Sequence, residues 1–373
     1  MVSLLHTADW QIGAAFGQFD SDDAPFLASA RIESVKTLAS LAFERQVDVV
    51  VVTGDVFDQQ TVQDALIRRL FNAMEAYAGR WVLLAGNHDA ALVESVWTRA
   101  SRLQCIPTNV TVVLEPKTIL FEELKLALLC APLTQRQTYG DTTEFFDTEE
   151  TPEGFLRIGL AHGSVQGYLP DDIDSANPIA ATRVQTARLD YLALGDWHGA
   201  LSINARTWYS GTHEQDRFKT NDPGYALVVT LTEPGAEPTV SRERVGKYTW
   251  HRWEKYISVS TDANLLADEL ATLGENDVLR VTVTGTADMR TTTAITLALE
   301  QCRAKVRALR SDMTGLTVLP SEEEIAGLSA QGGYVAAVVA RLKDMQADPT
   351  QSKVASEALM ILAQIQRDTK EAA

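Results

Sequence analysis

The chain has 373 residues, of which 45% are hydrophobic and 22% are charged, and its formal net charge is −17 at pH 7. This length exceeds one average domain and the composition allows a substantial core, so two or three globular domains are expected. The acidic balance argues against a basic surface as the main means of holding nucleic acid. A phosphate substrate would instead be met through bound cations or through the positive surface of a partner.

The cysteines and the apolar segments both favour a cytoplasmic protein. Cys105, Cys130 and Cys302 lie far apart and form no CxxC pair, which is typical of reduced thiols without a disulfide framework or a zinc knuckle. The N-terminal segment lacks a basic region and has too short an apolar run for a signal peptide. Because no stretch approaches the roughly 20 apolar residues of a membrane span, no membrane association is expected.

The N-terminal part of the chain alternates short apolar segments with longer amphipathic ones. Residues 47–52 are nearly all Val, which is typical of a strand covered on both faces. The alternation predicts α/β layering around a largely parallel sheet. We expect strands over 2–5, 47–52 and 81–85, and helices over 28–46, 62–77 and 91–103.

The next part of the chain is richer in strands. Residues 141–154 are acidic and are expected to form a surface loop, whereas residues 163–181, with Gly, Pro and Asp, are expected to form a loop near the site described below. Further strands are expected within 110–132 and over 156–162, 189–198, 208–212, 225–231 and 248–257, all in the same domain.

A smaller α+β unit is expected to begin near Ser258, and its size is below that of a typical domain. Its helices are predicted over 263–273 and 292–306, and its extended segments over 278–284 and 309–318. Beyond Pro320, two helical stretches over 322–345 and 352–367 are separated by a turn at Ala347-Asp348-Pro349. The predicted domains are 1–257, 258–320 and 321–373.

Five of the expected strands end in polar side chains that bind metals in other proteins. They are Asp9 and Gln11 in HTADWQIG, Asp55 in GDVFD, Asn87 and His88 in GNHD, His162 in AHG, and Asp196 and His198 in GDWHG. Any one of these motifs could be a turn or a helix cap. Together, at the tips of one sheet, they offer hard oxygen and imidazole ligands for two adjacent divalent cations. Such a pair, about 3.5–4 Å apart, binds a phosphate and activates water, and Asp55 is placed centrally enough to bridge it.

This series of motifs resembles that of the calcineurin-like metallophosphoesterases. More narrowly, HTADWQIG, ALGDWH and WYSGT resemble the SbcD-type nuclease subunits of SbcCD-type DNA repair complexes, and the motifs cover roughly residues 1–230. The resemblance implies a four-layered α-β-β-α sandwich, followed by a small α+β capping domain and C-terminal helices. It also implies two divalent cations, usually Mn²⁺ with Mg²⁺ possible. One would be held by Asp9, Gln11, Asp55 and His198, and the other by Asp55, Asn87, His162 and Asp196. His88 matches a catalytic histidine that is not a ligand.

Two positions depart from the family pattern. Gln11 stands where a histidine ligand is expected, and Asp196 stands where the first histidine of a His-x-His pair is expected. Both side chains keep a donor atom, so we expect an altered site that favours Mn²⁺ or Mg²⁺ over softer cations.

The remaining polar and aromatic residues near the motifs receive simpler interpretations. His6 is expected to support the ligands from behind, and Trp10 and Trp197 to pack beneath the cations. For His213 and His251 we expect surface or packing positions. Arg217 and Lys219 are either phosphate contacts or members of a solvated charged loop.

The most consistent function is a divalent-metal-dependent DNA exonuclease or endonuclease. Two alternatives stay open: a phosphatase or phosphodiesterase acting on nucleotides or other small substrates, and a weakly active scaffold that regulates an ATPase. The family resemblance implies DNA and an SbcC-like coiled-coil ABC-type ATPase as partners, with a homodimer inside a two-plus-two complex. Apolar residues on the C-terminal helices would bind that ATPase or pack on the capping domain, and they are Tyr334, Val335, Val338, Val339, Leu342, Leu359, Leu362, Ala363 and Ile365.

Overall fold

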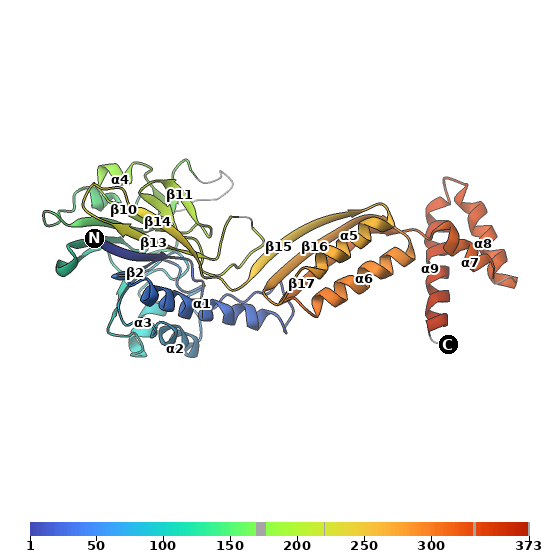
Figure 1. Cartoon of the computed structure of the whole chain (residues 1–373), viewed down its shortest axis with the longest axis horizontal. Coiled ribbons are helices and arrows are strands. Elements are labelled where there is room, and N and C mark those ends of the chain that lie inside the picture. The colour runs from blue at the N-terminus through green and yellow to red at the C-terminus, as the bar shows by residue number, and fades with distance from the viewer. Residues whose placement is uncertain (169–176, 220, 331–332, 372–373) are drawn as a thin grey trace. The chain divides into compact units, whose positions relative to one another are not determined.

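The structure, a computed structural model, describes residues 1–168, 177–219, 221–330 and 333–371 (Figure 1). The chain divides into two compact units, Met1–Thr249 and Trp250–Ala373. Among the described residues, none of the helices has both the length and the apolar character needed to cross a membrane.

Two six-stranded sheets form the centre of the first unit. The first sheet contains β1 (Val2–Thr7), β2 (Val49–Thr53), β3 (Arg80–Leu84), β4 (Val110–Val113), β13 (Tyr225–Leu231) and β14 (Thr239–Arg244). Its order is β14-β13-β1-β2-β3-β4, and β1 to β4 are parallel. The second contains β5 (Lys117–Phe121), β6 (Leu126–Ala131), β7 (Leu156–His162), β10 (Tyr191–Gly195), β11 (Leu201–Asn204) and β12 (Thr207–Tyr209). Its order is β11-β12-β10-β7-β6-β5, with β6, β7, β10 and β12 parallel.

The valines of β2 show how this unit is layered. Val49 and Val51 pack between the two sheets, together with Leu128 of β6. Val50 and Val52 point the other way, into the core beneath the helices. Both faces of β2 are therefore buried, which explains its continuous apolar sequence. The helices that cover this outer face are α1 (Ala24–Glu44), α2 (Asp64–Ala73) and α3 (Val96–Arg102) (Figure 1).

Short helices and loops cover the outer face of the second sheet. They include the 3₁₀ helix η2 (Glu144–Asp147) and α4 (Arg183–Thr186), whose side chains pack on the sheet in a separate core. The expected four-layered α-β-β-α sandwich is confirmed. The expectation of a plain surface loop over 141–154 is wrong around Phe146, because this ring is fully buried in that core.

Three smaller elements complete the first unit. The 3₁₀ helix η1 (Glu122–Leu124) separates β5 from β6, and β8 (Ser164–Val165) pairs with β9 (Pro178–Ile179). The last two strands lie within the loop expected over 163–181, of which residues 169–176 lie outside the described residues.

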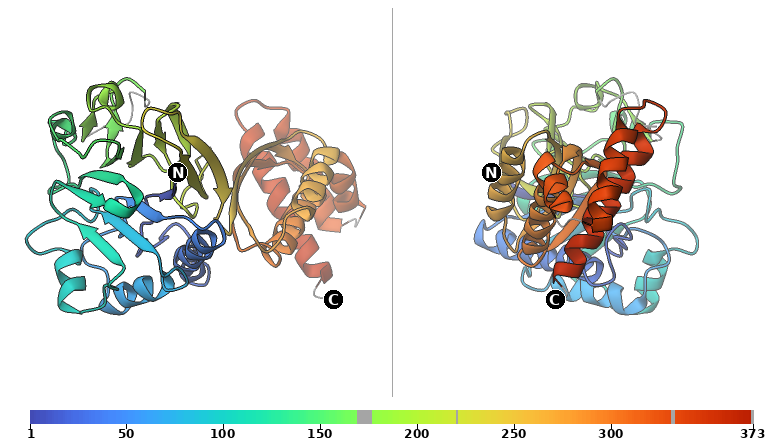
Figure 2. Two further views of the ribbon diagram at one scale, coloured as in Figure 1. Left: turned by 60° about the vertical axis from the view of Figure 1, so that its left-hand side comes forward. Right: turned by 90° about the vertical axis from the view of Figure 1, so that its right-hand side faces the viewer.

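The second unit begins with a three-stranded sheet covered by two helices on one face. The strands are β15 (Thr249–Ile257), β16 (Asp277–Ala287) and β17 (Ala308–Val318), in that order. The helices α5 (Ser260–Ala271) and α6 (Met289–Arg303) lie side by side over the sheet (Figure 2). Residues 248–257 were expected to close the first domain, and this is wrong for β15, because its hydrogen-bonded neighbour is β16. A strand's sequence periodicity does not specify which sheet it joins.

Three helices end the second unit. They are α7 (Glu322–Ser329), α8 (Gly333–Gln346) and α9 (Ser352–Glu371). The single helix expected over 322–345 is wrong, since α7 ends at Ser329 and a separate helix, α8, begins at Gly333. The helices share a small core built from Ile325, Leu328, Val339, Leu359 and Ala363.

Candidate metal centre

The segment after β1 carries the first two predicted ligands in an unusual backbone conformation. Asp9 and Gln11 are both buried and have φ values of +52° and +45°. Their backbone N–H groups donate to the carbonyl oxygens of Gly54 (3.1 Å) and Asp55 (2.9 Å), which ties the tip of β1 to the tip of β2. Left-handed conformations are rare for residues other than glycine, and they concentrate at functional sites.

Asp55 lies at the centre of the predicted site. Its Oδ2 accepts a hydrogen bond from Gln11 Nε2 at 2.7 Å, and its Oδ1 accepts from the backbone N–H of His88 at 2.9 Å. The glycine of GNHD is required for this approach, since a Cβ on Gly86 would lie 2.3 Å from Asp55 Oδ1. The glycine before Asp55 is equally constrained, because a Cβ on Gly54 would lie 2.2 Å from His162 Nδ1.

His162, at the end of β7, faces this carboxylate across the two sheets. Its Nδ1 donates to the carbonyl oxygen of Thr53 at 2.8 Å, so Nε2 is left to face Asp55 Oδ1 at 3.5 Å. Ligand atoms of Asp9, Asp55 and His162 all lie within 4.8 Å of one another. Burial would lower the pKa of His162, but the three carboxylates of Asp55, Asp9 and Asp196 outweigh it and raise that pKa to about 9.

Asn87 approaches the same group of atoms from the tip of β3. One atom of its side-chain amide lies 3.0 Å from His162 Nε2 and 3.0 Å from each carboxylate oxygen of Asp55. In the protein without a cation, the amide NH₂ group suits this position, because its two N–H groups can donate to the two carboxylate oxygens of Asp55. With a cation among these atoms, the amide oxygen is the matching ligand, so the position serves either state.

The tip of β10 carries Asp196 and His198. Asp196 has a φ of +100°, and its backbone N–H donates to Asp9 Oδ1 at 3.1 Å. Its Oδ2 accepts from Ser164 at 3.0 Å, while Oδ1 lies 3.8 Å from His162 Nε2. His198 lies on the far side of the same cavity, and its Nδ1 donates to Asp216 Oδ2 at 3.1 Å.

Asp216 is a functional candidate that the sequence motifs did not reveal. Burial would raise the pKa of Asp216, but the charge and hydrogen bond of His198 and the charges of Arg31 and Arg217 together outweigh it and hold that pKa far below its usual range. Asp216 in turn raises the pKa of His198 against the effect of burial. A carboxylate on Nδ1 fixes the ring and directs Nε2 outward, as metal-binding histidines commonly require. The local signal was the acidic residue beside Arg217 in QDRFKTNDPG, a segment in which only the basic residues suggested a role.

His88 differs from the predicted ligands in exposure and in partners. Its side chain is 39% exposed, whereas that of His162 is fully buried. Its Nδ1 donates to the carbonyl oxygen of Asp58 at 2.7 Å, and its Nε2 lies 3.9 Å from Asp55 Oδ2. The ring therefore borders the cavity, with Nε2 near the Asp55 carboxylate.

Residues behind the site join its strands. His6 is fully buried and contacts the hydroxyl groups of Tyr191 and Thr53 at 3.0 and 3.2 Å, which connects β1 with β10 and β2. Trp10 is fully buried in the core beneath the helices, as expected. The buried guanidinium of Arg31 donates to the carbonyl oxygens of Asp9, Trp10 and Glu214, which holds the tip of β1 against the segment that leads to Asp216.

The other two histidines occupy ordinary structural positions. His213 is fully buried and its Nε2 contacts the carbonyl oxygen of Arg31 at 2.7 Å. His251 is half-buried in β15 and its Nε2 pairs with Asp277 at 2.7 Å. Both agree with the expected surface or packing roles.

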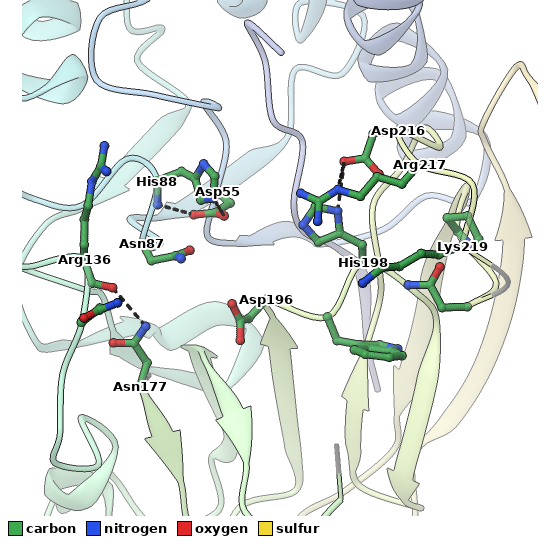
Figure 3. A pocket seen from close by; sticks show the side chains of 14 residues that line it. Asp55, Asn87, His88, Arg136, Asn177, Asp196, His198, Asp216, Arg217 and Lys219 are labelled. Atoms are coloured by element: carbon green, nitrogen blue, oxygen red, sulfur yellow. Dashed lines mark hydrogen bonds and ion pairs between the residues drawn. The ribbon is translucent and has the colours of Figure 1, made fainter. Parts of the chain in front are cut away.

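A cavity of about 250 Å³ opens over the predicted ligands (Figure 3). Its floor includes Asp55, Asn87 and Asp196, and its rim carries basic side chains. Arg217 and Lys219, the two candidate phosphate contacts, both line it, and so does Arg136 from the β6–β7 connection, which the sequence did not suggest. Trp197 is partly packed on the outer core of the second sheet and also lines the cavity, so packing is only part of its environment.

The residues present fit divalent cations. Gln11 is 1% exposed, and its Oε1 has no hydrogen-bond partner among the described residues, so a buried oxygen that could bind a cation is left unsatisfied. Two imidazoles, those of His162 and His198, use Nδ1 for a hydrogen bond and keep Nε2 as the atom that can bind a metal ion. Carboxylate and amide oxygens with imidazole nitrogens are ligands that Mn²⁺ and Mg²⁺ accept. This fold and this site define a metal-dependent phosphoesterase.

Comparison with known proteins gives the family. The model of the calcineurin-like phosphoesterases matches residues 2–230, and the chain belongs to this family. It is 26% identical over 259 residues to the DNA double-strand break repair protein Mre11 of Methanosarcina acetivorans, covering 65% of this chain and 39% of that protein. It is 27% identical over 276 residues to the SbcD subunit of the nuclease SbcCD of Bacillus subtilis, covering 63% of this chain and 68% of that protein.

Two further likenesses are weaker. The uncharacterized metallophosphoesterase YhaO of Bacillus subtilis is 23% identical over 237 residues, covering 61% of this chain and 57% of that protein. Among solved structures, TT1561 of Thermus thermophilus matches 65% of this chain and 99% of its own, with 12% identity and a TM-score of 0.39. That score is too low to bear on the fold.

Proposed function

We propose that this chain is a DNA nuclease of the SbcD type, which hydrolyses phosphodiester bonds as an exonuclease or endonuclease. The observation that carries the proposal is the convergence of Asp9, Asp55 and His162 within 4.8 Å at the carboxyl ends of parallel strands. The names of two relatives, a nuclease subunit and a DNA repair protein, point to nucleic acid as the substrate.

We infer two adjacent cation positions that share Asp55. The first takes Asp9, Gln11, Asp55 and His198, and the second takes Asp55, Asn87, His162 and Asp196. Mn²⁺ is the proposed cation, with Mg²⁺ as the alternative, because the donor set is dominated by oxygen. When bound, such cations supply Lewis acidity to the phosphate and lower the pKa of an attacking water.

His88 is the proposed catalytic residue. The hydrogen bond from its Nδ1 to the carbonyl oxygen of Asp58 fixes the ring. In the imidazolium form, Nε2 is then left to donate its proton to a phosphate oxygen or to the leaving oxygen. Its half-exposed side chain borders the cavity where substrate enters, in contrast to the buried ligands.

We infer an SbcC-like coiled-coil ATPase as the protein partner, with this chain acting as a homodimer in a two-plus-two complex. Exposed apolar residues on the C-terminal helices support this partner. Although α7, α8 and α9 share a core, Tyr334, Val354 and Ile361 are 84%, 62% and 54% exposed to solvent. Truncation after Pro320 should abolish co-purification with the ATPase and leave hydrolysis of simple phosphodiesters unchanged. Normal assembly of the truncated protein would rule this docking site out.

A cytoplasmic location stays a prediction from the three free cysteines.

The decisive experiment measures hydrolysis of linear DNA with Mn²⁺, with and without the ATPase. The proposal expects degradation of DNA that is lost on adding EDTA and in the variant Asp55→Asn. A matched control is Asp222→Asn, since this exposed carboxylate pairs with Arg242 and does not line the cavity. Hydrolysis of nucleotides or small phosphoesters but not of DNA would favour a phosphatase, and no hydrolysis of either would favour a regulatory scaffold.

A further inference from the structure

Two basic side chains stand on opposite sides of the predicted metal centre without an acidic partner. Figure 3 shows Arg136 at one edge of the cavity and Lys219 at the other, with Asn87, Asp196 and His198 between them. Within the described residues, neither Arg136 nor Lys219 forms an ion pair or a side-chain hydrogen bond. Arg217 differs, because its guanidinium lies 3.8 Å from the Asp216 carboxylate.

The backbone that carries Arg136 is fixed at the rim of the cavity. Asn177, which is 3% exposed and itself lines the cavity, donates through Nδ2 to the carbonyl oxygen of Arg136 at 3.2 Å. Its Oδ1 accepts from both the backbone N–H and the hydroxyl of Thr138, at 2.8 and 2.9 Å. The guanidinium therefore extends from an anchored turn.

Lys219 also follows an anchored residue. The ring of Phe218 packs against that of Phe19, with centroids 6.1 Å apart, which fixes the backbone next to Lys219. Asp216, two residues before Phe218, is held by His198. Both cations are thus presented to the cavity by segments that the fold holds in place.

The chain has a net charge of −17, so two basic side chains without an acidic partner in one cavity are unusual and call for a functional explanation. A phosphate monoester has one phosphate, which the metal centre itself would take up. A polynucleotide strand has further phosphates on both sides of the scissile one, at regular spacing. Cations on either side of the centre therefore match a strand that runs across it.

We propose that Arg136 and Lys219 bind the phosphates that flank the scissile phosphate of a DNA strand. These two residues thereby select polynucleotides over small phosphoesters. This inference rests on the proposed nuclease function and specifies how that site holds its substrate. Arg136 would contact the backbone on the Asn87 side of the centre, and Lys219 on the His198 side.

The test compares two substrates in the full-length protein with Mn²⁺. Bis(p-nitrophenyl) phosphate has one phosphodiester and no flanking phosphate, whereas a single-stranded oligodeoxynucleotide has many. Arg136→Ala and Lys219→Ala should each raise KM for the oligonucleotide by roughly 10-fold and reduce the slope of log KM against log salt by about 0.7. Activity on bis(p-nitrophenyl) phosphate should stay within about twofold of wild type. Arg69→Ala removes an exposed basic side chain of α2 that does not line the cavity, and it should leave the kinetics on both substrates unchanged.

Each contrary outcome has a distinct meaning. Equal losses on both substrates would show that these residues act on the reaction or on the fold, and would overturn the proposal. Unchanged KM and salt slope in both variants would show that they are solvated surface charges, and would also overturn it. A wild-type protein that hydrolyses neither substrate refutes the proposed function itself, which is a separate result.

Discussion

Replacing Gln11 tests whether the altered ligand set binds a cation as we infer. In the structure, Gln11 Nε2 donates to Asp55 Oδ2 at 2.7 Å, while its buried Oε1 has no hydrogen-bond partner within the part of the chain that the structure describes. A buried acceptor without a hydrogen bond costs about 1–3 kcal/mol. If a cation takes this oxygen as a ligand, binding removes that cost. Gln11→Met, which has a similar shape and no oxygen acceptor, should therefore weaken Mn²⁺ binding at the position shared by Asp9, Gln11, Asp55 and His198 by roughly 5- to 150-fold in Kd.

The opposite change should strengthen the same position. Gln11→His restores the imidazole that the family pattern has there, and imidazole is a better donor than a neutral amide. The histidine variant should reach full activity at a lower Mn²⁺ concentration than wild type, and the methionine variant at a higher one. We expect the same order in Mn²⁺ binding measured by calorimetry on the metal-free proteins.

The inference is refuted if the Mn²⁺ titration curves of wild type, Gln11→Met and Gln11→His superimpose. If wild type, Gln11→Met and Gln11→His bind and respond to Mn²⁺ alike, then Oε1 does not contact a cation, and Gln11 only donates to Asp55. Thermal unfolding of the three metal-free proteins shows whether a shifted curve reflects a damaged fold.

Three further predictions use the same assays. His88→Ala should keep its metal content near wild type while hydrolysis falls by roughly 100-fold or more, and joint loss of metal would refute its role as a non-ligand. Asp216→Ala should weaken Mn²⁺ binding by about 10- to 100-fold, Asp216→Asn less so because its Oδ1 still accepts from His198, and Asp222→Asn not at all. Burial, helped by the charge of Arg31, lowers the pKa of His213 in the folded protein to about 3. As the pH falls, the unfolded chain therefore binds a proton at this histidine before the folded protein does. The free energy of unfolding should therefore fall by up to about 1.4 kcal/mol per pH unit as the pH drops from about 6.5 toward 3. Urea unfolding at several pH values should show that this free energy falls less steeply with pH in His213→Gln than in wild type.

The sheets and the strand-end residues were predictable because their signals are local. A continuous valine run such as 49–52 fits only a strand covered on both faces, and the structure covers it with a helix layer and a second sheet. The carboxyl ends of parallel strands share an edge, so the motifs after β1, β2 and β3 had to lie together. The same rule, applied to β7 and β10 in the second sheet, brought His162 and Asp196 to that edge.

The parts that were missed depend on contacts between distant segments. Asp216 contacts His198 across 18 residues, and the turn of Arg136 is held by Asn177, 41 residues away. Neither pairing leaves a periodic or motif signal in the sequence. The membership of β15 was missed for a related reason, since its alternation of exposed and buried residues fits an edge strand of either unit. Tertiary context decides such cases.

Under the proposed function, the charge distribution suits a polyanionic substrate at one place on an acidic protein. Asp9, Asp55 and Asp196 lie close together at the strand tips. Burial, and to a smaller degree the charges of Asp55 and Asp196, raise the pKa of Asp9 to about 6, so this arrangement disfavours further negative charge. A phosphate would be repelled from these carboxylates unless cations of higher charge lay between them. Arg136 and Lys219 add attraction only at the rim, on the path that a strand would follow. Under this proposal, substrate affinity and catalysis depend on the same ligands, and the rim residues would discriminate between substrates that the metal centre alone would treat alike.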